Sequence, residues 1–137
     1  MNISGSLHVT IQTGVLIETV AEHVAKVRWC SCNIFSIQDH AAAAIAKTGT
    51  STVFACKGEI RAEYWWCTEQ IFTWPGCNEP DQIINDGSDT TMFIPKDPIK
   101  WNGRAANCRE VSEETTTGLH RLKDMTKKDE VLSLPSM

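Results

Sequence analysis

The feature that most constrains the fold of this chain is a regular alternation between strand-like and helix-like segments. Six strand-like segments recur along the 137 residues, at 3–7, 26–31, 51–55, 82–85, 109–111 and 130–134. Four segments with helical pattern or composition lie between them, at 13–24, 37–47, 61–72 and 115–127. Such alternation is typical of βαβ units. The sequence therefore predicts an α/β fold with three layers, in which helices flank a largely parallel sheet.

Composition narrows the classes of protein to which this chain can belong. The formal net charge is −4 at pH 7, and no Lys/Arg-rich run precedes the pair Lys127-Lys128, which argues against a nucleic-acid-binding surface. No apolar run approaches the roughly 20 residues that span a bilayer, and the first residues lack the pattern of a secretory signal. We therefore expect a cytoplasmic protein that binds neither nucleic acid nor membrane.

Two of the helical segments carry specific expectations about packing. Segment 13–24 has Glu18 and Glu22 on one side, and its apolar face is expected to comprise Val15, Leu16, Val20 and Val24. Segment 61–72 carries aromatic residues at helical spacing, which predicts core packing for Trp65, Trp66 and Phe72. Residues 89–108 interrupt the alternation, and we expect a helical turn there followed by irregular chain.

The six cysteines are expected to be reduced and mostly buried, because no secretory signal accompanies them. Cys30 and Cys32 are separated by one residue, which does not fit a zinc knuckle, and the other four stand at irregular intervals. His23 and His120 have no acidic or cysteine partner at ligand spacing. The sequence therefore predicts no metal site.

Polar residues concentrate where strand-like segments give way to helical ones. The junctions concerned are 8–13, 33–40, 85–89 and 112–118. In an open parallel sheet ligands bind beyond the carboxyl ends of the strands, near the point where strand order reverses. Four polar junctions at one edge predict a pocket for a hydroxyl-rich ligand.

Each junction also has an ordinary structural explanation. Ser112 can cap the last helix, and Asp86-Gly87 is typical of a turn, although its carboxylate can also be held near sugar hydroxyls. His8 can be a hydrogen-bonded structural histidine or a proton carrier near neutral pH. Three threonines at 115–117 are not explained by helix propensity. With the free N–H groups of the first turn they predict a surface for a carboxamide or phosphate.

The same junctions resemble a known family. Residues 7–19 (LHVTIQTGVLIET) resemble the start of the substrate domain of S-adenosyl-L-homocysteine hydrolase, or adenosylhomocysteinase. Residues 31–36 (SCNIFS) and 38–47 (QDHAAAAIAK) form a long further match, and 112–118 (SEETTTG) follow in the family's order. The resemblance spans roughly 5–134 and thins between 73 and 108. It implies a Rossmann-like substrate-binding domain.

The resemblance also implies an activity. Members of this family reversibly hydrolyse S-adenosyl-L-homocysteine to adenosine and L-homocysteine, using a tightly bound NAD. The cofactor oxidises the ribose 3′-hydroxyl, which acidifies the neighbouring C4′ proton. Homocysteine leaves by elimination, water adds, and the ketone is reduced again.

Carried over by motif, four residues take roles at the nucleoside. Thr10, Asp86 and Glu114 would contact it, the carboxylates at or near the ribose hydroxyls. His8 would lie near the 5′ side and take part in proton transfer with the leaving group or water. The catalytic set implied by the resemblance is therefore His8, Asp86 and Glu114.

Five further residues receive binding roles from the resemblance. Gln12 and Ser36 would line the adenine end of the substrate site. The nicotinamide-proximal part of NAD would be hydrogen-bonded by Thr115, Thr116 and Thr117.

The chain departs from the family in identifiable places. Family members usually show two Asp and two Gly where it has Asn85-Asp86-Gly87-Ser88. The family's catalytic lysine and its Gly-rich NAD-binding domain lie beyond the position of Met137. Residues 1–137 contain no GxGxxG motif. We therefore expect 1–137 to form a single, partial substrate domain, a fragment or degenerate copy that lacks hydrolase activity alone. The alternative is a non-catalytic nucleoside-binding or regulatory partner of full-length subunits, since the family forms homo-oligomers.

Overall fold

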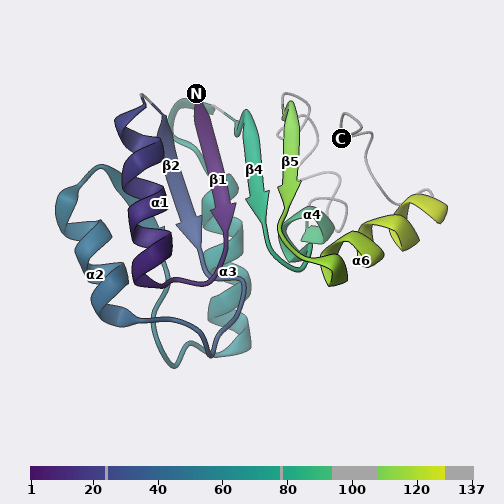
Figure 1. Ribbon diagram of the computed structural model, residues 1–137, viewed down its shortest axis with the longest axis horizontal. Coiled ribbons are helices and arrows are strands. Elements are labelled where there is room, and N and C mark those ends of the chain that lie inside the picture. The colour runs from purple at the N-terminus through teal and green to yellow at the C-terminus, as the bar shows by residue number, and fades with distance from the viewer. Residues whose placement is uncertain (24, 78, 94–107, 129–137) are drawn as a thin grey trace.

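A computed structural model describes residues 1–23, 25–77, 79–93 and 108–128, which form a parallel five-stranded sheet with helices on both faces (Figure 1). The strands are β1 Asn2–Ser6, β2 Lys26–Cys30, β3 Ser51–Phe54, β4 Gln82–Asn85 and β5 Glu110–Glu113. The helices are α1 Ile11–Glu22, α2 Asp39–Thr48, α3 Arg61–Phe72, the short 3-10 turn η1 Pro75–Cys77, α4 Asp89–Phe93 and α6 Thr116–Lys127. The predicted α/β fold is confirmed.

Strand order reverses beside β1, and this reversal positions the loops that follow the strands. The order is β3-β2-β1-β4-β5, and every adjacent pair is parallel. The chain thus runs outward from β1 to β3 and then returns to add β4 on the other side of β1. Ser6, the last residue of β1, pairs with Cys30 of β2 and with Asn85 of β4. The loops after these three strands therefore start level with one another.

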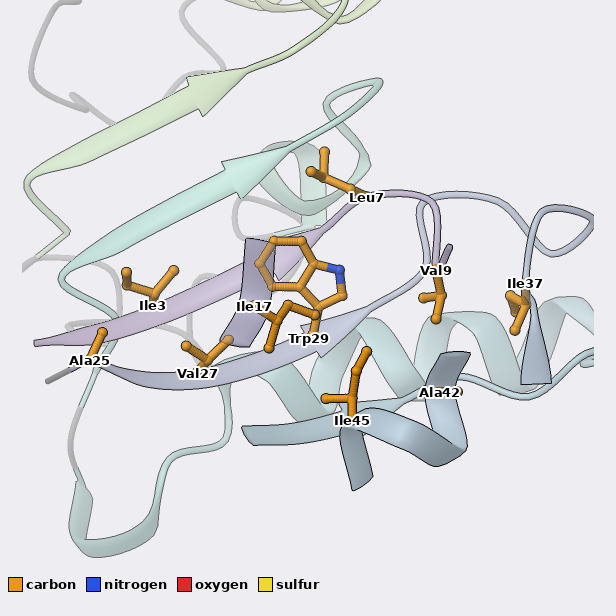
Figure 2. Close-up of a cluster of buried hydrophobic side chains, with 10 residues drawn as sticks. All are labelled: Ile3, Leu7, Val9, Ile17, Ala25, Val27, Trp29, Ile37, Ala42 and Ile45. Atoms are coloured by element: carbon orange, nitrogen blue, oxygen red, sulfur yellow. The ribbon is translucent and has the colours of Figure 1, made fainter. Parts of the chain in front are cut away.

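The two faces of the sheet bury different residues because side chains alternate along each strand. Val27 and Trp29 of β2 belong to a cluster on the face covered by α1 and α2 (Figure 2). That cluster comprises Ile3, Leu7, Val9, Ile17, Ala25, Val27, Trp29, Ile37, Ala42 and Ile45. Cys30 belongs to a second cluster with Ile71 and Phe72 of α3, which lies behind the sheet in Figure 1.

The centre of the first cluster depends on a glycine. Trp29 is fully buried, and its indole lies against Gly5 of the neighbouring strand. A Cβ built at Gly5 would stand 2.1 Å from Trp29 Cε3, which is far inside van der Waals contact. The missing side chain of Gly5 therefore makes the space that the tryptophan occupies.

Most predicted elements are found at or near the expected positions. Segments 61–72 and 82–85 coincide with α3 and β4, and the other predicted elements within the described residues differ by at most two residues at either end. A helical turn, α4, opens the irregular stretch as expected. Residues 94–107 and the predicted strand 130–134 lie outside the described residues.

Two predictions about which side chains are buried are wrong, one in α1 and one in α3. Val15 and Leu16 of α1 are 59% and 38% exposed, whereas the helix buries Thr13, Gly14 and Ile17. Gly14 packs beside Ile45 of α2, and a Cβ added at Gly14 would lie 3.7 Å from Ile45 Cγ1, which is an ordinary van der Waals distance. Val20 does pack against the core, and Val24 lies outside the described residues.

The aromatic residues of α3 divide between core and surface. Phe72 is buried and Trp65 is half-buried, but Trp66 is 55% exposed, so its assignment to the core is wrong. Trp66 instead makes an edge contact with Phe54 of β3, with ring centroids 6.1 Å apart. The buried stripe of α3 consists of Tyr64, Cys67, Thr68, Ile71 and Phe72, which recur at helical spacing, and position 66 falls outside this stripe.

The cysteines with described side chains are unpaired. Cys30, Cys67 and Cys108 are buried, Cys32 is half-buried and Cys56 is exposed. Burial raises the pKa of the Cys30 thiol and that of the Cys67 thiol to about 12. These two therefore behave as buried apolar groups, as the sequence predicts. In the part of the chain that the structure describes, no helix is long and apolar enough to cross a membrane.

We predict that Gly5→Ala lowers the free energy of unfolding by about 2–3 kcal/mol, because Trp29 has no space to yield to the new methyl group. Urea denaturation measures the change. Gly14→Ala is the matched control, since its Cβ makes only ordinary contact with Ile45 and alanine favours a helix by up to about 1 kcal/mol. Equal losses in the two variants would contradict the proposed close packing.

A second prediction concerns Glu59, which is buried beside α3. Its carboxylate accepts from the Cys56 N–H at 3.4 Å and from the Cys67 thiol at 3.8 Å. Burial raises the pKa of this carboxyl above its ordinary value of 4.5. The folded state therefore retains the proton more strongly than the unfolded state. The resulting stabilisation is present below pH 4.5 and is lost as the pH rises through the raised pKa.

We expect Glu59→Gln, which cannot ionise, to gain thermal stability relative to the parent protein as the pH rises from 4.5 to neutrality. Thermal unfolding followed by circular dichroism across this range measures the difference. Glu18→Gln on the exposed side of α1 serves as the control. A difference between Glu59→Gln and the parent that does not change with pH would show that Glu59 does not titrate as described.

Candidate functional site

Three side chains from separate loops converge where strand order reverses. His8 follows β1, Cys32 follows β2 and Asp86 follows β4. The Nε2 of His8 lies 3.3 Å from Asp86 Oδ2, and the Cys32 thiol donates to the same oxygen at 3.4 Å. Cys32 Sγ is also 3.5 Å from His8 Nδ1. Cys32 is 24 positions from His8 and 54 positions from Asp86 in the sequence, yet the three side chains are in contact. We call this group the His8–Cys32–Asp86 cluster.

His8 is held at both its backbone and its ring. Its carbonyl accepts from the Thr13 hydroxyl at 2.5 Å and from the Thr10 N–H at 3.1 Å, which ties it to the start of α1. Its Nδ1 lies 2.5 Å from the Ser36 hydroxyl. Ser36 Oγ in turn donates to the Asn33 carbonyl at 3.2 Å, so it accepts from Nδ1–H of His8. The imidazole is therefore oriented with Nε2 toward Asp86.

Asp86 is a largely enclosed carboxylate, with 14% of its side chain exposed. Its backbone N–H donates to the Ser6 carbonyl at 3.0 Å, which continues the β1–β4 pairing into the loop. Burial raises the pKa of the Cys32 thiol, and the adjacent Asp86 carboxylate raises it further. In the absence of a cation the thiol therefore stays protonated and donates to Asp86.

A second set of polar contacts lies next to this cluster. The Tyr64 hydroxyl of α3 donates to Asp89 Oδ2 at 2.9 Å, and Arg121 of α6 pairs with Asp89 Oδ1 at 3.0 Å. Arg121 also donates to the Gly87 carbonyl. Burial and the neighbouring Asp89 raise the pKa of Tyr64, so the phenol remains a donor. These groups line an open cleft of about 370 Å³ that Cys32 also borders.

Glu113, at the end of β5, joins the loop after β4 to the start of α6. Its Oε1 accepts from the Gly87 N–H at 2.8 Å and from the N–H and hydroxyl of Thr115 at 3.1 and 2.9 Å. Its Oε2 accepts from Asn85 Nδ2 at 3.2 Å and from the N–H and hydroxyl of Ser88 at 3.1 and 3.0 Å. One carboxylate thus receives three donors on each oxygen, and these bonds fix the loop that carries Asp86.

The two departures from the family motif both contact Glu113. Ser88 adopts a left-handed conformation, with φ of 65°, that favours glycine. Its hydroxyl offsets this strain through Glu113 and lies 2.8 Å from the Gly118 carbonyl. Asn85 is fully buried and supplies an amide donor, where an aspartate would place a second carboxylate beside Glu113. A Cβ at Gly118 would stand 2.0 Å from Glu113 Oε1, so the absence of a side chain at this position leaves space for the carboxylate.

The structure brings together some of the predicted nucleoside residues. His8, Ser36 and Asp86 are linked by direct contacts. Thr10 is the N-cap of α1, where its hydroxyl accepts from the Thr13 N–H at 3.4 Å. Gln12 is exposed in the first turn of the same helix. Their contacts with a nucleoside stay predictions.

Among the predicted site residues that follow β5, the side chain of one is hydrogen-bonded within the protein and those of three are exposed. Glu114 is exposed, and its N–H donates to the Asn85 carbonyl at 2.9 Å. Thr115 caps α6 by accepting from the Gly118 N–H at 3.1 Å, so the alternative that Ser112 caps this helix is wrong. Thr116 and Thr117 are exposed at the helix N-terminus. Their contacts with NAD stay predictions.

Sequence reasoning missed three residues that organise the site. Cys32 was grouped with the structural cysteines, although it stands at the start of a polar junction. Glu113 stands beside Glu114 in the junction 112–118, and the sequence alone does not distinguish the roles of two adjacent glutamates. Tyr64 comes from a helix on the other face of the sheet, and its contact with Asp89 spans 25 positions.

A family model described as S-adenosyl-L-homocysteine hydrolase matches residues 1–98 of this chain. The chain belongs to the S-adenosyl-L-homocysteine hydrolase family. The matched range contains all of His8, Cys32 and Asp86, together with Tyr64 and Asp89. The His8–Cys32–Asp86 cluster therefore lies within the matched segment, whereas Glu113, Glu114 and Arg121 lie beyond it.

We predict that Glu113→Gln lowers the free energy of unfolding by about 2–3 kcal/mol. Glutamine places an NH2 group where one carboxylate oxygen was, and that group meets three donors in either orientation of the amide. Urea denaturation measures the loss. Glu114→Gln, exposed and adjacent, should change stability by less than about 0.5 kcal/mol. Similar effects of the two substitutions would contradict the role given to Glu113.

Proposed function

We propose that this chain is a substrate-binding unit of an adenosylhomocysteinase and that it binds the adenosine part of S-adenosyl-L-homocysteine. The observation that supports this most is the meeting of His8, Ser36 and Asp86 from three loops, at the edge where strand order reverses. That position is where open α/β sheets bind ligands. Membership in the family supplies the substrate class.

Asp86 and Glu114 would accept hydrogen bonds from the ribose hydroxyls. Asp86 is enclosed and held by its backbone contact with Ser6, so its carboxylate can accept from a ligand without reorganising. Glu114 is exposed and follows β5 on the same edge. Thr10, the N-cap of α1, would add a hydroxyl to these contacts. Enclosed carboxylates make strong, charge-assisted hydrogen bonds with hydroxyl donors.

The remaining nucleoside contacts concern the base and the 5′ side. Gln12 presents an exposed carboxamide in the first turn of α1, which can pair with the edge of adenine, and Ser36 lies near by in the His8 contact network. His8 would hold a proton at Nε2, 3.3 Å from Asp86, and exchange it with the leaving group or water at the 5′ position. Its 48% exposed side chain leaves room for this exchange.

The residues at the start of α6 fit one end of NAD. The exposed Thr116 and Thr117 hydroxyls stand beside the helix N-terminus, where N–H groups lack helical partners. These two are better placed than Thr115, whose hydroxyl is occupied by Glu113 and Gly118. When bound, NAD would accept a hydride from the ribose 3′ carbon. The 137 residues contain no GxGxxG motif, so we propose that they do not complete hydrolysis alone.

We predict that Asp86→Asn weakens adenosine binding at least about tenfold, because it removes a charged acceptor for ribose hydroxyls while keeping the shape of the side chain. Isothermal titration calorimetry with adenosine, with and without NAD, measures the affinity. Asp124→Asn is the control, since Asp124 is exposed on α6 and pairs with Lys127.

Three outcomes bear on this proposal. Binding that depends on Asp86, without turnover of S-adenosyl-L-homocysteine, supports a substrate-binding unit. Equal affinities in the parent and Asp86→Asn would exclude Asp86 from the nucleoside site. Turnover by this chain alone would contradict the proposed dependence on further polypeptide.

A further inference from the structure

The His8–Cys32–Asp86 cluster brings together three side chains of metal-binding type. One ligand atom from each, an imidazole nitrogen, a thiol sulfur and a carboxylate oxygen, lies within 4.8 Å of the other two. The three residues come from three separate loops, so no local turn requires them to be adjacent. This convergence is produced by the sheet topology, and it places one nitrogen, one sulfur and one oxygen ligand around a common point.

The spacing of these atoms suits a tetrahedral ion. Zinc binds sulfur at about 2.3 Å and nitrogen or oxygen at about 2.0–2.2 Å, which in a tetrahedron separates neighbouring ligand atoms by about 3.3–3.6 Å. The observed separations are 3.4 Å between Cys32 Sγ and Asp86 Oδ2 and 3.3 Å between His8 Nε2 and Asp86 Oδ2. Two of the three edges of the ligand triangle are therefore already of the right length, and all three ligand atoms lie within 4.8 Å of one another.

The orientation of His8 also favours an ion. Its Nδ1–H is directed to Ser36 Oγ, whose own hydrogen goes to the Asn33 carbonyl. Nε2 then faces Asp86 Oδ2 at 3.3 Å, a position that either a proton on Nε2 or a metal ion between the two atoms can occupy. The Ser36 contact matches the usual arrangement around a metal-bound histidine, in which the other ring nitrogen donates to an oxygen.

We propose that His8, Cys32 and Asp86 form a zinc-binding site, with the fourth position of the ion left for a water molecule. The mixed set of nitrogen, sulfur and oxygen ligands selects a borderline-soft ion such as Zn²⁺ over Mg²⁺ or Ca²⁺, which prefer oxygen alone. Binding forms a Zn–S bond and releases the thiol proton of Cys32 to solvent. The site is reached from the side of His8, whose side chain is 48% exposed.

This zinc site goes beyond the proposed function, because an ion bound there would regulate nucleoside binding. His8 and Asp86 are also the residues to which we assign nucleoside contacts, so an ion on them would exclude adenosine. The competition rests on the proposed function, whereas metal binding does not. The two can therefore fail separately: zinc can bind a chain that has no affinity for adenosine.

The test uses Co²⁺ as a spectroscopic substitute for zinc, added to the reduced full chain. We expect a near-ultraviolet thiolate-to-cobalt band in the parent protein, its loss in Cys32→Ser, and its retention in Cys56→Ser, whose cysteine is exposed and away from the cluster. Zinc affinity, measured by competition with a chelating dye, should fall more than about tenfold in Cys32→Ser and in Asp86→Asn. Circular dichroism checks that each variant is folded.

Asp86→Asn keeps the test decisive if Cys32→Ser does not fold, because it retains the sulfur and should weaken the cobalt band without abolishing it. The proposal is overturned if the parent protein gives no cobalt band at high micromolar metal. It is also overturned if the band survives in Cys32→Ser or disappears in Cys56→Ser. Loss of zinc affinity in Asp86→Asn alone, with Cys32→Ser unaffected, would place the ion elsewhere and overturn it as well.

Discussion

The parallel pairing of β1 with β2 on one side and with β4 on the other decides where the polar loops of this protein meet. Because Ser6 is level with both Cys30 and Asn85, the chain leaves three strands at the same height. His8, Cys32 and Asp86 are each reached within two residues of those strand ends. Their distances of 3.3–3.5 Å follow from this register, since a shift by one residue would turn the loops to other positions.

The register at β1 depends in turn on packing beneath it. Gly5 leaves the space for Trp29, which holds β1 and β2 against α1 and α2. On the other side of β1, Glu113 gathers donors from the loop after β4 and from the start of α6. An apolar contact thus fixes one half of the site, and the half-buried carboxylate of Glu113 fixes the other. Asn85 and Ser88 show that the carboxylate half tolerates changes that supply it with donors.

The sequence predicted the layers, the strand positions and the edge that carries the polar loops, because these follow from the period of the pattern and from turn residues. It did not predict which face of α1 is buried, since Gly14 contributes no hydrophobicity and matters only through its closeness to Ile45. Cys32 escaped notice for a related reason. Its partners, His8 and Asp86, are 24 and 54 positions away, and no local spacing reveals them.

Charge at this edge favours uncharged ligands and cations over anions. Asp86, Asp89, Glu113 and Glu114 lie on the loops or strand ends that form it, whereas two cationic side chains, Arg61 and the Asp89-paired Arg121, line the adjoining cleft. Glu113 is enclosed by six donors, so the carboxylate that remains for a ligand inside the cluster is Asp86. A 5′-phosphate placed beside it would meet like charge in a site of low exposure, which is unfavourable. A nucleoside hydroxyl and a metal ion both meet an acceptor there, and this shared requirement makes the two occupants competitors for Asp86.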